Sequence, residues 1–151
     1  MLIGGYLIVA GIEAMILGLI SLVIFSGLAP FPLTVIDTLV MMVCLAVYLL
    51  LLGNYIISMG LLIDTVTTLF LITFITFIFI LFGNGFIIEF GFFPAGIENF
   101  LRWQPLSIPY QAFQLFIRSG IIDWALLFSS LLLGLLWMLG NTTILKRKLR
   151  H

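Results

Sequence analysis

The fold of this chain is decided by the stretch at residues 121–150, which reads IIDWALLFSSLLLGLLWMLGNTTILKRKLR. Up to residue 145 it holds one ionisable side chain, Asp123, and a helix over residues 121–145 would be roughly 37 Å long, enough to cross a bilayer. Four of the six Lys and Arg residues then follow within five positions. Such basic clusters stay on the cytoplasmic side of a membrane. The stretch therefore predicts a membrane-crossing helix that ends in a basic cytoplasmic tail, residues 146–151.

Three stretches upstream also have the length and apolar character of a spanning helix. They cover about residues 2–26, 33–52 and 56–82. Pro30 and Pro32 interrupt the chain between the first two stretches, and Gly53-Asn54 predicts a short connection between the second and the third. With the C-terminal stretch, the sequence predicts four transmembrane helices.

Two short polar patterns mark helix starts. Thr34 stands three residues before Asp37 and ahead of an apolar run, which is the pattern of a capping box. Asp64 followed by Thr65 is a second possible helix start inside the third stretch. We expect both aspartates to cap helices, close to opposite faces of the membrane.

The composition excludes several classes of protein. Hydrophobic residues make up 64% of the 151 residues and charged residues 8%, with a mean hydropathy of +1.37, so one water-soluble core of this size cannot bury the apolar surface. Six basic and six acidic residues give no net charge, which leaves no basic face for nucleic acid. The single cysteine excludes an internal disulfide, and the single histidine excludes paired-imidazole metal sites. The sequence predicts an all-α polytopic protein with the lipid bilayer as its solvent, without a metal or cofactor.

The orientation follows from four spans and one basic tail. Because the tail is cytoplasmic, an even number of spans places the N-terminus in the cytoplasm as well. The Pro30 turn and residues 83–120 then face outward. We expect residues 1–151 to form a single membrane domain.

Residues 83–120 are too apolar for an ordinary loop, yet prolines exclude one continuous spanning helix there. These prolines are Pro94, Pro105 and Pro109. Two short helices are predicted, over residues 95–103 and 109–118, with Glu98 of the first able to pair with Arg118 of the second. Such amphipathic helices lie in the membrane interface or dip partway into it. We expect an outward helical hairpin, the alternative being a plain exposed loop.

Residues 91–120, which read GFFPAGIENFLRWQPLSIPYQAFQLFIRSG, carry a family resemblance. Followed by a last span and a KRKLR tail, they resemble the C-terminal part of a type-2 ABC-exporter permease. In that family an outward hairpin between the last two spans has a Phe-Pro entry, a Pro-Leu step and an Arg before a Gly. The matching residues are Phe93-Pro94, Pro105-Leu106, Arg118 and Gly120.

The resemblance implies that the four spans correspond to the last four of the family's six, and so it covers essentially the whole chain. It also implies a separate cytoplasmic ATP-binding subunit and a second permease chain, identical or different. In the family, an amphipathic helix and two further spans precede the four that match here. They have no counterpart before Met1, so we expect a partial or split permease. The expected location is the cell membrane of a bacterium or archaeon.

Glu13 is the one ionisable residue well inside a span. A charge at the centre of a bilayer costs at least about 2.5 kcal/mol, so this carboxyl should face protein or water. It either forms part of a transport path or is a neutral, hydrogen-bonded group that fixes helix packing. Gly4, Gly11 and Gly18 repeat every seven residues around it and predict a close contact with another helix.

The third stretch carries four threonines within about 140° of one helical face. They are Thr65, Thr68, Thr73 and Thr76. Their hydroxyls either line a polar path or bond the carbonyl one turn back. The candidate transport path therefore consists of Glu13, Thr68 and Thr76.

No residue pattern for catalysis is present. The chain lacks a phosphate-binding G-x-x-x-x-G-K-[ST] motif, and its one histidine, His151, is terminal, which excludes a nucleophilic triad. We therefore expect no enzyme but the permease subunit of an ABC exporter, driven by ATP that a partner hydrolyses. The alternative is a non-catalytic subunit that anchors or assembles a larger membrane complex.

Overall fold

The computed structural model describes residues 2–28, 34–85 and 87–149, and every regular element in them is helical. The Pro30 turn lies outside the described residues. The elements are α1 (Leu2–Leu28), α2 (Val35–Leu62), α3 (Val66–Gly83), the short 3-10 helix η1 (Phe90–Phe92), α4 (Ala95–Trp103), α5 (Ser107–Ser119) and α6 (Trp124–Lys148). The expected all-α fold is thus confirmed for this part of the chain.

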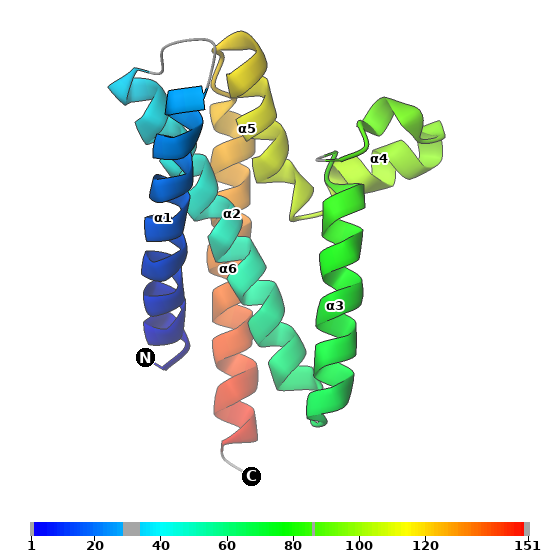
Figure 1. Ribbon diagram of the computed structural model, residues 1–151. Coiled ribbons are helices and arrows are strands. Elements are labelled where there is room, and N and C mark those ends of the chain that lie inside the picture. Colours follow the sequence, from blue (N-terminus) through cyan, green and yellow to red (C-terminus); the bar gives the residue numbers. More distant parts are fainter. Residues whose placement is uncertain (1, 29–33, 86, 150–151) are drawn as a thin grey trace.

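Helix α2 is the centre of the bundle (Figure 1). It packs along α6 and α1, whereas α3 touches it near one end and then diverges. Helix α5 packs against α2 and α6 at the opposite end, and α4 extends sideways above the end of α3. The start of α1 and the end of α6 lie at the same end of the bundle.

The start of α2 is the capping box that the sequence predicts. The Thr34 side chain accepts a hydrogen bond from the Asp37 backbone N–H at 3.2 Å, and the Asp37 carboxylate accepts one from the Thr34 backbone N–H at 2.9 Å. Each bond satisfies a backbone N–H that the start of a helix leaves unpaired.

The connection predicted at Gly53-Asn54 is wrong, because α2 continues through both residues to Leu62. The Asn54 side-chain amide donates to the Leu50 carbonyl at 2.8 Å and to the Gly134 carbonyl of α6 at 3.2 Å. With its amide satisfied inside the bundle, Asn54 does not end the helix.

Helix α3 begins after Thr65, in agreement with the second possible start in the sequence. Asp64 does not cap it, which corrects the expectation. Its carboxylate instead accepts an ion-paired hydrogen bond from Lys148 at 3.2 Å, and this links the start of α3 to the end of α6.

The hairpin follows the sequence closely. Helix α4 spans the nine residues expected, with Pro94 as its N-cap residue. Helix α5 starts at Ser107, two residues before the predicted start, and ends at Gly120 in the left-handed conformation with φ of 67°. Glycine adopts this conformation without steric strain.

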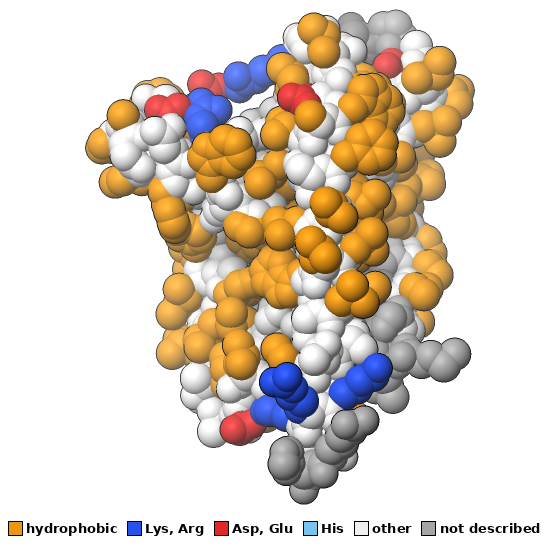
Figure 2. Space-filling view, turned by 180° about the vertical axis from the view of Figure 1, so that it is seen from behind, with side chains coloured by type: hydrophobic (Ala, Val, Ile, Leu, Met, Phe, Trp, Pro, Cys, Tyr) orange, Lys and Arg blue, Asp and Glu red, His pale blue; other side chains and the backbone are white. Residues whose placement is uncertain are grey.

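Two helices, α2 and α6, are long and apolar enough to cross a membrane. Among the described residues, the other two long helices hold shorter apolar stretches, Ile8–Ser21 and Val66–Ile80. On the face shown in Figure 2, charged side chains gather at the two ends of the molecule and hydrophobic side chains cover the region between them. The Asp64–Lys148 pair belongs to one end, and the charges of the hairpin belong to the other.

Candidate functional site at the hairpin vertex

The turn between α4 and α5, called here the hairpin vertex (residues 104–107), points into the bundle. Leu106 is buried and packs in one cluster with Leu51 of α2 and Ile80 of α3, next to Leu133 and Trp137 of α6. Leu51 and Trp137 lie near the middle of their helices. The vertex therefore reaches about halfway along both of the helices that are long enough to cross a membrane.

One glutamine holds the vertex in place. The side-chain amide of Gln104 lies within hydrogen-bonding distance of three acceptors: the Gly83 carbonyl at 3.2 Å, Asn84 Oδ1 at 3.0 Å and Ser107 Oγ at 2.6 Å. Ser107 is fully buried and its hydroxyl donates to Asn84 Oδ1 at 3.0 Å. The network ties the non-helical turn to the end of α3 and pairs the polar side chains at the vertex with one another and with the Gly83 carbonyl.

A cavity of about 270 Å³ lies beside this network, between α2, α3 and α5. Its walls are almost entirely apolar, and it is lined by Cys44, Leu45, Tyr48, Ile80, Asn84, Pro109, Tyr110 and Phe113. The cavity offers no ionised group for acid–base chemistry, and its chemistry suits an apolar occupant.

A second polar cluster joins α2 to α6 below the vertex. Asn141 donates to the Asn54 carbonyl at 3.0 Å and accepts a hydrogen bond from the Ser58 hydroxyl at 2.7 Å, while Trp137 Nε1 donates to Ser58 Oγ at 2.7 Å. Asn54 and Asn141 are almost completely buried. Among the described residues, no buried side-chain N or O atom lacks a partner. Because a shift of α2 along α6 would break the bonds of this cluster, the cluster fixes the register of the two helices.

The candidate path residues do not meet within this chain. Glu13 lies on α1 and the threonines lie on α3, on opposite sides of α2 (Figure 1). The Thr68 hydroxyl lies 2.7 Å from that of Thr65, and the Thr76 hydroxyl lies 2.6 Å from that of Tyr55 in α2. Thr76 therefore contributes to the contact between α2 and α3, and the described part of the chain does not bring the three residues together.

The charged residues of the hairpin pair differently from the expectation. Arg118 pairs with Glu89 at 2.8 Å, not with Glu98, and Glu98 pairs with Arg102 one turn along α4. Glu89 and Arg118 are each about two-thirds exposed, at 64% and 65%, so this ion pair contributes little stability.

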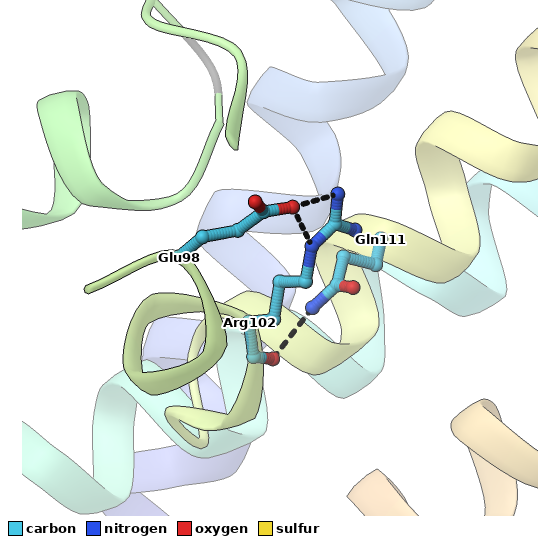
Figure 3. A network of polar contacts seen from close by, with 3 residues as sticks. All are labelled: Glu98, Arg102 and Gln111. Atoms are coloured by element: carbon cyan, nitrogen blue, oxygen red, sulfur yellow. Dashed lines mark hydrogen bonds and ion pairs between the residues drawn. The ribbon is translucent and has the colours of Figure 1, made fainter. Parts of the chain in front are cut away.

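Figure 3 shows how α4 and α5 are joined near these charges. The Gln111 side chain donates to the Arg102 carbonyl at 2.6 Å, close to the end of α4. Pro94 and Pro105 stand just before and just after α4. The prolines thus set the bounds of α4, the first arm of the hairpin. The Gln111 side chain of α5, the second arm, bonds the backbone near the end of α4.

Several residues of the site escape sequence reasoning. They are Tyr48, Asn54, Ser58, Asn84, Gln104, Ser107, Trp137 and Asn141. Those in α2 and α6 are polar side chains in largely apolar helices, and that is the available signal, because a buried amide or hydroxyl needs a partner. The identity of the partners is not visible in the sequence, since Asn54 and Asn141 are 87 positions apart.

Within the described residues, no three His, Cys, Asp or Glu side chains are grouped so that they could hold a metal ion. Comparisons with protein-family models, with curated proteins and with solved structures find no match to this chain. Function is therefore inferred from the arrangement of its own side chains.

Proposed function

We propose that the chain crosses a membrane four times: α1, α2 and α6 each cross it, and α3, which enters from the inner side, ends where it meets the hairpin, which enters from the outer side. On the face shown in Figure 2, charged side chains gather at the two ends of the molecule with apolar side chains between them, which supports four crossings. At about 1.5 Å per residue, α3 with its 18 residues would be roughly 27 Å long, less than the hydrocarbon core of about 30 Å, and the hairpin completes this crossing. The basic residues that end α6 support a cytoplasmic location for that end and for the start of α1.

The observation that carries the proposal is the depth of the hairpin vertex. Irregular backbone is tolerated inside a membrane only where protein or a cavity surrounds it. Leu106 is buried against the middle of the bundle, and the Gln104 amide and the Ser107 hydroxyl supply the polar contacts beside it. These features suit a re-entrant hairpin and are not needed by a loop in water.

The function that this arrangement supports best is that of a permease subunit of an ABC exporter. The re-entrant hairpin between the last two spans would close the outer side of a transport path, and a second permease chain would complete the path. Energy would come from ATP hydrolysed by a separate cytoplasmic subunit, so the chain itself would not be an enzyme. The resemblance of residues 91–120 to the hairpin of type-2 exporters adds support.

Co-purification tests this proposal. The chain, tagged and expressed at native level, is extracted from its own membranes in a mild detergent, and its partners are identified by mass spectrometry. We expect an ATP-binding subunit in stoichiometric amount, and ATP hydrolysis by the complex that disappears when the phosphate-binding lysine of that subunit is replaced. Recovery of a redox or secretion complex without an ATP-binding subunit would contradict the export function and favour an anchoring subunit.

A further inference from the structure

Glu13 occupies an unusual position on α1. It lies about 16 Å from the start of the helix and about 22 Å from its end, at 1.5 Å per residue. Gly18 marks the side of α1 that packs on α2, because a side chain at Gly18 would collide with Leu45. At 100° per residue, Glu13 is 140° away from Gly18 around the helix, and its side chain is exposed. The carboxyl therefore points away from the rest of the bundle.

The side of α1 that carries Glu13 has the spacing of a helix-packing seam. Ala10, Glu13, Leu17 and Ile20 follow one another at intervals of three, four and three residues, and all four are exposed. Apolar residues at this spacing pack against a second helix, and a small residue such as Ala10 permits close approach. A single polar residue in such a seam selects the partner and its register.

Within the described residues, nothing donates a hydrogen bond or forms an ion pair with the Glu13 carboxylate. If α1 crosses the membrane, as in the proposed function on which this inference rests, a lone carboxylate at this depth is strongly unfavourable. A cationic side chain brought by another helix would reduce that penalty. This requirement limits the partner to a helix that carries a lysine or an arginine.

A second copy of this chain does not supply the cation. All six basic residues stand in the hairpin or the tail, at Arg102, Arg118, Lys146, Arg147, Lys148 and Arg150, and none stands in α1, α2 or α3. We propose that the Glu13 face of α1 binds a transmembrane helix of a different chain, one that presents a lysine or arginine near the middle of the membrane. In a split permease this helix would belong to the second permease chain.

A defined helix serves as the probe. The chain carries a fluorescence donor at Leu149→Cys in a Cys44→Ala background and is reconstituted in liposomes with acceptor-labelled host peptides. These peptides are transmembrane helices of leucine and alanine with either one central lysine or leucine in its place. We expect saturable energy transfer with the lysine peptide, and at least tenfold weaker association with the leucine peptide or with the Glu13→Leu variant.

Further variants define the face and the fold. Leu17→Ala lies on the seam and should weaken the association a few-fold, whereas Leu19→Ala, 120° from Glu13 and also exposed, should not change it. Glu13→Leu should leave the far-UV circular dichroism unchanged, because the Glu13 side chain forms no hydrogen bond or ion pair with the described residues of the bundle. Equal binding of the lysine peptide to wild type and to Glu13→Leu would overturn the inference, as would self-association of the chain that depends on Glu13.

The same preparation separates this inference from the proposed function. Liposome flotation after an alkaline wash, which removes proteins bound only to the surface, reports membrane insertion, and failure of the chain to float would refute both. Insertion with lysine-dependent association, but without an ATP-binding subunit in the native complex, would refute export and leave the partner assignment standing.

Discussion

Replacing Gly134 by leucine is expected to destabilise the bundle by about 2 kcal/mol. A Cβ atom at this position of α6 would lie 2.8 Å from Leu50 Cδ2 and 3.5 Å from Leu51 Cδ2 in α2, and a whole leucine would force the two helices apart. Overpacking of this kind lowers the free energy of unfolding by about 1–3 kcal/mol or more, whereas the better helix propensity of leucine raises it by less than about 1 kcal/mol. Separation of the helices would also lengthen the bond from Asn54 to the Gly134 carbonyl.

The measurement is unfolding of the detergent-solubilised protein by added sodium dodecyl sulfate, followed by circular dichroism. Gly140→Leu is the matched control, because it lies on the same helix and a Cβ there would meet nothing within 4 Å. We expect that control to be neutral or slightly stabilising. Equal stability of the Gly134 and Gly140 variants would show that α2 and α6 do not approach as closely as described.

Replacing Gln104 by methionine is expected to loosen the hairpin vertex. Methionine has a similar length but no donor, so the Gly83 carbonyl, Asn84 Oδ1 and Ser107 Oγ each lose the partner that Gln104 provides. The Ser107 hydroxyl still donates to Asn84 Oδ1, so the Gly83 carbonyl is the acceptor left without a partner. A buried polar group left unpaired costs about 1–3 kcal/mol. The backbone amides near the vertex should exchange with deuterium about tenfold faster or more, since 1.4 kcal/mol corresponds to a factor of ten.

Gln111→Met is the matched control for this change. Gln111 also belongs to the hairpin and also donates one side-chain hydrogen bond, but its bond to the Arg102 carbonyl is exposed. Substitutions at such positions usually change stability by less than about 0.5 kcal/mol. If both variants gave the same exchange rates at the vertex, the proposed role of Gln104 would be wrong.

Local signals in the sequence predict those parts of the fold that depend on neighbouring residues. The bounds of α4 follow from Pro94 and Pro105, because proline limits the conformations on either side of a helix. The start of α2 follows from Thr34 and Asp37, whose side chains reach each other within one turn. In both cases the interacting groups lie within a few positions of each other, so the local sequence is sufficient to predict the structure.

The parts that sequence reasoning misses depend on distant partners. Gly53-Asn54 has the local character of a turn, yet Asn54 remains helical because its amide meets the Gly134 carbonyl 80 positions away. The site is missed for the same reason, since Gln104 bonds Asn84 across 20 positions. Glu13 is correctly singled out as an isolated charge, but its orientation away from α2 becomes visible only in the folded helix.

The account depends on the hairpin and the basic tail lying on opposite sides of a membrane, and thiol accessibility in intact cells tests this most directly. Single cysteines are placed at Ser119, near the end of α5, and at Leu149, in the tail, both exposed and both in a Cys44→Ala background. A membrane-impermeant maleimide should label Ser119→Cys in intact cells and Leu149→Cys only after lysis. Labelling of both positions from the same side would contradict the account.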